Sequence, residues 1–171
     1  LRAWADVRAG EVIGGTADLA LADVNTTLGT GLQALTLRSI EGRLGARRLS
    51  GGFEFSTQGL QFQTDDGLTW PGGNLRLVHT AAAGNAPAQG EFRADRLDLA
   101  ALAQIASRLP LGPTAHQALQ AYTPQGLVDE IQATWRGPLD HPVQYQVKSK
   151  IRGLSLAGGA TDAATAHLGL R

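Results

Sequence analysis

The sequence predicts a mainly β protein with one helical pair, an α+β fold built on a curved antiparallel sheet or β-groove with an apolar face. Three observations carry this prediction. Apolar and polar residues alternate with period two along most of the chain, as they do in half-buried strands. The 22 Gly residues fall between these alternating runs, where the turns of a β-rich protein lie. One central stretch instead spaces its apolar residues as a helix does.

Strands are predicted over about residues 12–94. Leu19 and Leu21 alternate with polar or small neighbours, which is the pattern of a half-buried strand. Asp66-Gly67 is the strongest local hairpin signal, because Gly tolerates the positive φ of a tight turn. The other alternating runs lie at residues 35–37, 40–44, 53–55, 60–62, 75–77 and around 92.

The first helix is predicted at about residues 98–109. Leu99, Leu102 and Ile105 lie on one face of such a helix, at core spacing. Asp98 is the expected N-cap, and a proline directly after the segment ends it. Neither this helix nor the next carries a paired polar constellation, so we expect the two helices to plug or brace the sheet.

The second helix is predicted at about residues 114–122. Thr114-Ala-His-Gln117 matches a capping box, in which the first and last side chains satisfy free backbone amides at the helix start. A proline and a glycine follow closely and stop the helix. The helical pair with its flanks occupies residues 97–123.

A hairpin is predicted over residues 126–156, because two alternating runs flank a Gly- and Pro-containing turn. The polar face of its second strand is rich in Lys and Gln and is expected to meet water. Asp129 stands on the otherwise apolar face, and we interpret it as fraying of the strand near Gly126. Residues 158–171 are small and polar and predict a flexible tail. The predicted cross-strand pairs are Trp135 with Val143, Ile131 with Val147 and Glu130 with Lys148.

Composition excludes several classes of function. Lys+Arg and Asp+Glu both number 15, and this balance argues against a nucleic-acid binder, which needs a concentrated basic surface. No apolar run approaches the roughly 20 residues that cross a bilayer. The chain has no Cys, which excludes disulfides and thiolate chemistry. It also has no Met, so we expect an internal segment of a longer protein whose targeting or anchoring elements lie elsewhere.

Motifs of catalysis and cofactor binding are weak. Gly29-Thr-Gly31-Leu-Gln-Ala34 has the spacing of a dinucleotide fingerprint, but the next residues alternate as a strand where that motif needs a helix. Asp65-Asp66-Gly67 lacks the remaining ligands of a calcium loop. Ser50 is not in a nucleophile elbow, and Arg47-Arg48 is interpreted as a solvated turn rather than a phosphate site.

Metal binding and glycoside hydrolysis have no clear set of residues either. None of the four histidines is paired at a metal-binding spacing, and no Cys is available to complete a site. No particular pair of carboxylates stands out as the acid and base of a glycosidase. We therefore expect no enzyme, no metal and no cofactor. The histidines considered are His79, His116, His141 and His167.

The remaining candidate site is the apolar face of the sheet. Its side chains either close into an ordinary core or line an open groove, and the alternation alone does not decide between the two. The residues predicted to lie on this face are Leu19, Leu21, Leu35, Leu37, Phe53, Phe55, Leu60, Phe62, Leu75, Leu77, Ile131, Trp135, Tyr145 and Val147.

Several short stretches, taken in order, resemble the periplasmic AsmA-like superfamily, in particular its YhdP-type branch. The resemblance runs from about Val12 to Leu156. The stretches are Gly59-Leu-Gln-Phe62, Asp66-Gly-Leu-Thr-Trp-Pro71, Gly90-Glu-Phe-Arg-Ala-Asp-Arg-Leu-Asp-Leu99, Leu109-Pro-Leu111, Pro124-Gln-Gly-Leu-Val-Asp129, Trp135-Arg-Gly137 and Tyr145.

The resemblance implies a long envelope protein of a Gram-negative bacterium, anchored in the inner membrane, with a periplasmic body of repeated β-grooves. Its relatives are implicated in moving phospholipid toward the outer membrane and in keeping that barrier intact. The partners implied are phospholipid acyl chains, with the membrane reached through other parts of the parent protein. No catalytic residues come with the family. Two alternatives remain open at this stage, a structural scaffold of the envelope and a carbohydrate-binding β-sandwich.

Overall fold

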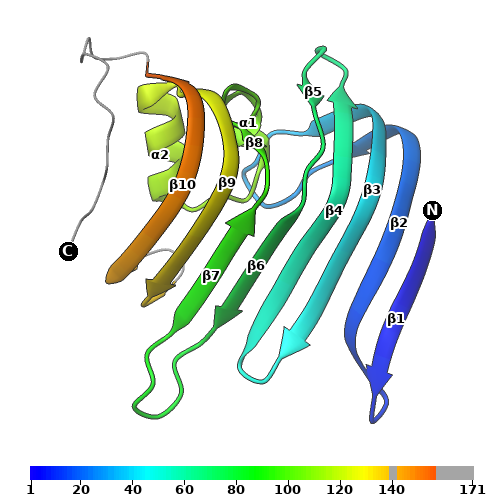
Figure 1. Ribbon diagram of the computed structural model, residues 1–171. Coiled ribbons are helices and arrows are strands. Elements are labelled where there is room, and N and C mark those ends of the chain that lie inside the picture. The colour runs from blue at the N-terminus through cyan, green and yellow to red at the C-terminus, as the bar shows by residue number, and fades with distance from the viewer. Residues whose placement is uncertain (139–141, 157–171) are drawn as a thin grey trace.

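The computed structural model describes residues 1–138 and 142–156. Within these residues, ten strands form a single antiparallel sheet in the order β1-β2-β3-β4-β6-β7-β9-β10, with β5 paired to β4 and β8 paired to β9 (Figure 1). The predicted curved antiparallel sheet with a helical pair is thereby confirmed. The strands are β1 (Arg2–Arg8), β2 (Glu11–Thr26), β3 (Leu35–Leu49), β4 (Gly52–Thr64), β5 (Thr69–Trp70), β6 (Leu75–Thr80), β7 (Gln89–Ala94), β8 (Leu97–Asp98), β9 (Gln125–Arg136) and β10 (Gln144–Ser155).

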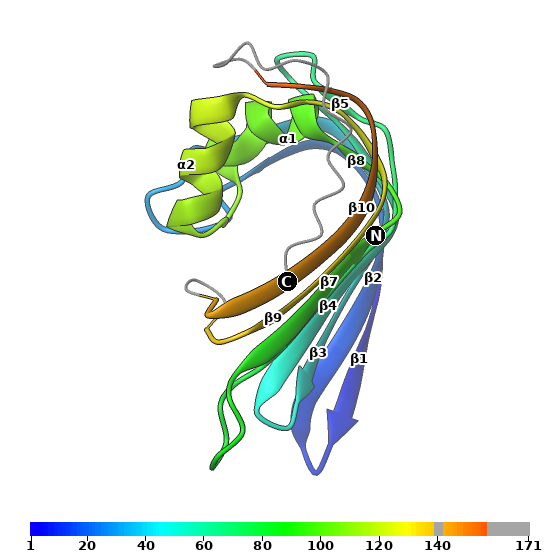
Figure 2. The same ribbon diagram turned by 60° about the vertical axis from the view of Figure 1, so that its left-hand side comes forward.

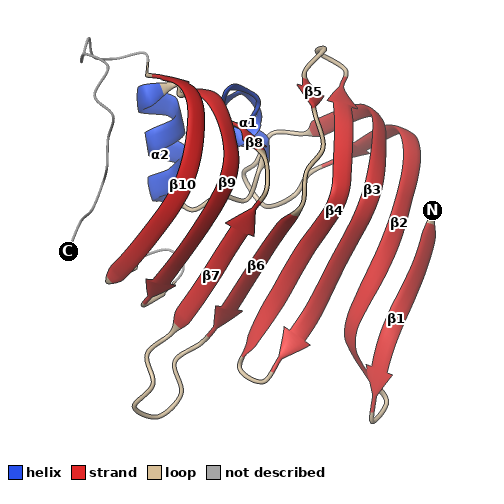
Figure 3. Ribbon diagram, in the orientation of Figure 1, coloured by secondary structure: helices blue, strands red, loops and turns tan. Residues whose placement is uncertain are grey.

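The helices are α1 (Leu99–Ile105), the 3-10 turn η1 (Ala106–Arg108) and α2 (Pro113–Tyr122), and they lie on one side of the sheet (Figure 3). Figure 2 shows that β9 and β10 bend strongly from their lower to their upper ends, with the helices inside the bend near the top. The sheet therefore forms a trough that runs across the strands, and the helices occupy its upper part.

The pairing register divides the sheet into two faces, because residues directly opposite each other point to the same side. One face carries an unbroken row of apolar partners across six strands, and we call it the apolar face. The neighbouring residues on the same strands form the polar face. The apolar row is Ala46, Phe55, Leu77, Phe92, Ala133 and Val147.

Two irregular positions, Asp23 in β2 and Arg38 in β3, keep the upper halves of both strands on the apolar face. Leu37 lies opposite Thr64 and Ile40 opposite Phe62, so Leu37 and Ile40 share a face although they are three residues apart. The extra residue in β3 is Arg38. The runs predicted at 35–37 and 40–44 are therefore one strand, and the prediction of two was wrong because the bulge interrupts the period of two.

A further bulge joins two other predicted runs. Gln58 pairs with Arg43 and Gln61 with Glu41, so one extra residue lies between the two glutamines. Gly59, whose φ is 55°, provides it. The predicted runs around Phe55 and Phe62 are consequently the two halves of the continuous strand β4.

The hairpin of Asp66-Gly67 is confirmed as the turn between β4 and β5, with Gly67 at a φ of 91°. β1 was not predicted. Its residues are exposed on both faces at the edge of the sheet, and two of its three apolar-face residues are alanines, so the alternation is faint. The predicted tail at 158–171 lies outside the described residues.

The first predicted helix is confirmed, and its start is as expected. The Ala101 N–H donates to Asp98 Oδ1 over 3.0 Å, which makes Asp98 the N-cap. The α-helix ends at Ile105 and the last turn tightens into η1. α2 begins earlier than predicted, because Gly112 is the N-cap and Pro113 occupies the first helical position, where its missing N–H costs nothing.

The hairpin of β9 and β10 is confirmed, but its predicted register was wrong by two residues. Trp135 pairs with Tyr145 rather than with Val143, and Glu130 pairs with Lys150 rather than with Lys148. Likewise Ile131 faces Ser149 and not Val147. Val143 is instead part of the turn, where its N–H donates to Arg136 O over 2.8 Å. A shift of two leaves every side chain on its predicted face.

The interpretation of Asp129 as fraying was also wrong. Asp129 is the extra residue of a bulge in β9, because Val128 pairs with Ile151 while Glu130 pairs with Lys150. The Asp129 carboxylate is bonded by Arg152. The bulge turns Val128 onto the apolar face, where it is 3% exposed, and it moves Leu127 off that face.

The best-buried residues of the described chain lie at the upper end of the sheet, under the helices. Ile105 of α1 is 2% exposed and Leu37 is 3% exposed. A compact cluster of Ala94, Leu97 and Val128 packs there against Leu99. The protein is therefore best packed where the helices cover the apolar face.

Candidate functional site

The apolar face is covered in its upper part and open in its lower part. Below the helices lies a hollow of about 800 Å³, a size within the range of ligand sites. Phe53, Phe55 and Leu77 line it from the sheet, and Pro110, just after η1, reaches it from the helical side. Phe53 is 39% exposed, Val147 48% and Tyr145 70%. The described residues thus leave a continuous apolar surface accessible along the lower trough.

The register brings all the predicted face residues onto the one apolar face, but it does not leave them equally accessible. Leu35 and Leu37 are 6% and 3% exposed, so they belong to the core beneath the helices and offer no surface to a ligand. Phe62 stacks on Trp70 with ring centroids 5.8 Å apart. The predicted residues that keep some exposure are Leu19, Leu21, Phe53, Phe55, Leu60, Phe62, Leu75, Leu77, Ile131, Trp135, Tyr145 and Val147.

Other residues of this face escaped the prediction. Ala46 is part of the apolar row, and its small side chain gave no strong signal. Phe92 follows from the alternation of β7, which was recognised as a strand without a face being assigned to it. Val128 was hidden by the bulge at Asp129.

The helical segment is tied by polar contacts to two connections between strands. Arg108 Nη2 lies 2.7 Å from Asp66 Oδ2 in the β4–β5 turn. Ser107 Oγ donates to Gln33 Oε1 over 3.1 Å, and the Gln33 N–H donates to Ser107 O over 3.2 Å. Since α1 also contacts β8 and β9, the segment extends along the trough from β9 to the β2–β3 connection.

The Asp66 carboxylate is held ionised by its surroundings. Hydrogen bonds from Arg108 and from the Thr64 hydroxyl lower its pKa from 3.8 to about 2. The motif Asp65-Asp66-Gly67 therefore forms the β4–β5 turn and attaches the helical segment to it through Asp66 and Arg108.

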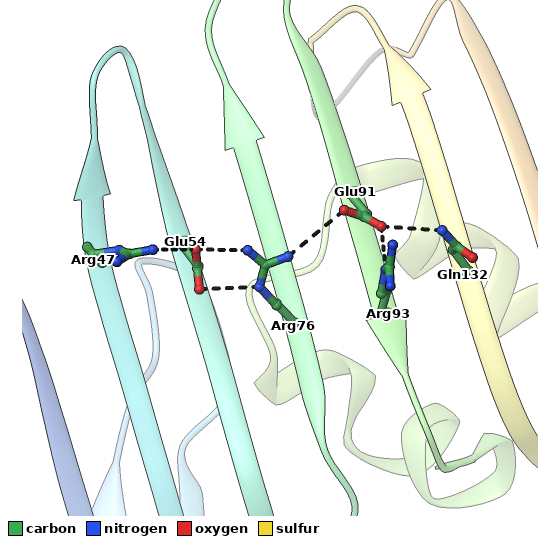
Figure 4. A network of polar contacts seen from close by, with 6 residues as sticks. All are labelled: Arg47, Glu54, Arg76, Glu91, Arg93 and Gln132. Carbon is green, nitrogen blue, oxygen red and sulfur yellow. Dashed lines mark hydrogen bonds and ion pairs between the residues drawn. The ribbon is translucent and has the colours of Figure 1, made fainter.

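The polar face carries a ladder of charges across β3, β4, β6 and β7, which Gln132 of β9 joins through a hydrogen bond to Glu91 (Figure 4). Arg47 Nη2 and Arg76 Nη2 each lie 3.1 Å from Glu54 Oε2. Glu91 continues the ladder, bonded by Arg93 and 3.9 Å from Arg76. Hydrogen bonds from Arg76 and Arg47 hold the pKa of Glu54 below its usual range. This arrangement favours permanently ionised side chains and a hydrated face.

The remaining sequence candidates are dispersed. Gly29-Thr-Gly31-Leu-Gln-Ala34 lies in the β2–β3 connection and leads into a strand, as the alternation predicted. His116 Nε2 lies 2.6 Å from Ala106 O and joins α2 to η1. His141 and His167 lie outside the described residues.

Arg47 and Arg48 do not form a turn, contrary to our interpretation, because β3 extends through Leu49 and sends the two side chains to opposite faces. Arg47 belongs to the polar ladder and Arg48 to the apolar face. In the part of the chain that the structure describes, no group of three His, Asp or Glu residues could hold a metal ion. No helix in that part is both long and apolar enough to cross a bilayer.

Comparisons with known proteins agree with this architecture. The family model described as YhdP protein matches residues 1–167. Searches of curated proteins and of solved structures gave no significant match. The family match covers nearly the whole chain, including every strand and helix described above. The chain therefore belongs to the YhdP family of bacterial envelope proteins.

Proposed function

We propose that this chain is a segment of a lipid-conducting β-groove, in which the apolar face carries phospholipid acyl chains between the inner and outer membranes. The observation that carries the proposal is the open lower trough, where Phe53, Val147 and Tyr145 are exposed on an otherwise apolar surface. Contiguous exposed apolar surface on a protein marks an interaction site. Membership of an envelope family supports a lipid as the occupant.

The energetics of lipid transfer favour such a surface. A phospholipid that crosses water exposes roughly 30 methylenes, at about 0.8 kcal/mol each, so the cost is on the order of 25 kcal/mol. A continuous apolar row along the trough lowers this cost at every position. The row runs across the strands, so a lipid can pass from one strand to the next without leaving apolar contact.

The proposal assigns the chain a non-catalytic role in the periplasm, as part of a longer protein with its membrane anchor elsewhere. The charged groups of the polar face support this role. The carboxylates of Glu54 and Glu91 accept hydrogen bonds from Arg76 and Arg93. This pairing favours a structural role in the ladder over the role of a glycosidase acid, which must donate a proton to the substrate. An envelope scaffold remains the alternative, and it predicts that no lipid occupies the trough.

The test is lipid capture by the gently purified chain, measured by mass spectrometry of extracted lipid, together with transfer of a fluorescent phospholipid between vesicles. Leu77→Asp places a charge on the apolar face beside the hollow. Thr80→Asp is the matched control, since it places the same charge on the polar face of the same strand, opposite the uncharged Gly52 and Gln89. We expect Leu77→Asp to abolish capture and Thr80→Asp to retain it. Absence of lipid from the unmodified chain in both assays would refute the proposal.

A further inference from the structure

The lower rim of the trough carries a row of side chains that differs from the apolar row above it. This rim row is Arg48, Phe53, His79, Gly90, Trp135 and Tyr145, each paired with the next across β3, β4, β6, β7, β9 and β10. At a strand spacing of about 4.8 Å, five steps extend roughly 24 Å. Because it crosses the strands, the rim row runs parallel to the trough.

The rim row marks a boundary of polarity on the apolar face. The row one step higher, from Ala46 to Val147, has no polar side-chain atom. In the rim row, four of six positions have a polar or charged group at the end of a long or aromatic side chain. Side chains of this kind suit the boundary between an apolar phase and water.

Two nitrogens of the rim row have no hydrogen-bond partner among the described residues. These are His79 Nδ1 and Trp135 Nε1, and both are buried. The Trp135 ring lies over Gly90, where an added Cβ would come within 2.1 Å of Trp135 Cζ2. Because both nitrogen atoms are covered by protein, the exposed polar side chains of the rim row are Arg48 and Tyr145.

Arg48 brings a positive charge to the same row. Its side chain is 74% exposed, and its Nη1 lies 3.9 Å from Oε2 of its ion-pair partner, Glu11. Arg47, on the opposite face, is 3.1 Å from a less exposed Glu54 and is committed to the polar ladder. Tyr145 at the other end of the row is 70% exposed. The rim therefore presents one loosely paired cation at one end and an exposed phenol at the other.

We propose that the rim row binds the phosphodiester of a membrane phospholipid while the acyl chains lie on the apolar row above it. This inference rests on the proposed function and adds an orientation to it, with the head group at the lower rim and the chain ends toward the helices. Arg48 attracts the phosphate charge at one end of the rim row, and the Tyr145 hydroxyl donates to phosphate oxygens at the other end.

Tryptophan quenching tests the orientation. Trp135 lies in the rim row, and Trp70 lies in the upper part of the sheet, stacked on Phe62. The double variant Trp4→Phe/Trp70→Phe keeps only Trp135, and the double variant Trp4→Phe/Trp135→Phe keeps only Trp70. A phospholipid with a nitroxide on its head group should quench Trp135 more than Trp70. A nitroxide at the end of an acyl chain should give the opposite order. Equal or reversed quenching would overturn the assigned orientation.

Lipid binding tests the role of the phosphate. With phosphatidylglycerol as the probe, Arg48→Ala should weaken binding roughly tenfold, the effect of losing a charge-assisted hydrogen bond. Diacylglycerol, which has the same acyl chains but no phosphate, should bind the unmodified chain and Arg48→Ala with equal affinity. Arg47→Ala is the matched control and should leave both affinities unchanged. Thermal melting of each variant checks that it is folded.

The outcomes separate the two proposals. If both lipids bind the unmodified chain with affinities that neither Arg48→Ala nor Arg48→Glu lowers, the rim row does not bind phosphate. The lipid groove of the proposed function is then retained. If Arg48→Ala weakens both lipids equally, Arg48 acts on the shape of the trough and the phosphate role fails. If neither lipid binds the unmodified chain, the lipid groove and the rim row fail together.

Discussion

The upper and lower ends of the apolar face have the same kind of sequence but different surroundings. At the upper end Ile105 is 2% exposed and Leu37 is 3% exposed, because α1 and η1 lie over the sheet. At the lower end Phe53 is 39% and Tyr145 70% exposed on the same face. Strand alternation therefore identifies which face of the sheet is apolar. Whether that face becomes buried core or open surface depends on the element that covers it.

The largest effect on stability is expected from a substitution under the helices, at the covered upper end of the sheet. Ile105→Ala removes a fully buried side chain from beneath the helices and should cost about 2–5 kcal/mol of unfolding free energy. Gln104→Ala, on the exposed side of the same helix, should cost less than about 0.5 kcal/mol. Urea unfolding measures both. A similar loss from the two variants would show that the helices do not brace the sheet.

A smaller effect is expected at the open end, from Gly90→Ala. The new Cβ would come within 2.1 Å of Trp135 Cζ2, so the ring must move away from β7. We expect a loss of about 1–3 kcal/mol and a red shift of the Trp135 emission in a single-tryptophan background. Gly112→Ala, where no atom lies within 4 Å of the added Cβ, is the control for the emission only, because Ala is a poorer N-cap of α2 than Gly and lowers stability by itself. Unchanged emission in the Gly90 variant would contradict the close packing of this ring.

The polar face should contribute less again. Glu54→Gln breaks the centre of the ladder between Arg47 and Arg76 and should cost about 0.5–1 kcal/mol, as partly exposed ion pairs do. Because the folded state lowers the pKa of Glu54, this contribution is complete above the carboxylate's ordinary pKa of 4.5 and is lost as the pH falls through the folded value. Thermal melting from pH 6 down to acid should show the difference between wild type and Glu54→Gln shrinking. Glu41→Gln is the matched control on the same face.

The smallest effect on global stability is expected from Asp66→Asn, because the change affects an exposed attachment of the helices. The pKa of Asp66 is lowered from 3.8 to about 2, so its contact with Arg108 stabilises the folded state above about pH 4 and is lost between pH 4 and 2. Amide exchange in α1 and η1 should be faster in the variant at pH 5, while exchange in β3 and β4 stays unchanged. If exchange rises equally throughout the sheet, Asp66 is not a local attachment of the helices.

Much of the fold followed from the sequence because two periods coexist in it. The alternation in β2 and β4 and the helical spacing around Ile105 are strong signals, and so are Asp98 as N-cap and Gly67 as a turn residue. The errors arose where a bulge changes the phase of the alternation, at Arg38, Gly59 and Asp129. A bulge depends on the partner strand, which a single run of residues does not reveal.

The candidate site was predictable in its composition and not in its accessibility. The face residues from Leu19 to Val147 could be named from alternation, since each points to the side opposite its polar neighbours. That Leu37 is covered and Phe53 is open depends on where α1 and η1 lie, which is a tertiary property. The rim row was hidden for another reason. Arg48 was interpreted together with Arg47, although adjacent residues of a strand face opposite ways.

The paired interruptions in β2 and β3 have a consequence for how such a chain can change its length. Asp23, with φ of 53°, and Arg38 face each other between the same neighbouring pairs, so the two strands change phase together. Deleting Arg38 alone would leave Leu37 on the apolar face and opposite Thr64, but it would leave Asp23 in β2 as an extra residue with no counterpart in β3. Deleting both would leave regular pairing across β2, β3 and β4, with Leu37 still opposite Val24 and Thr64. Tolerated deletions at this level of the sheet should therefore occur together in β2 and β3.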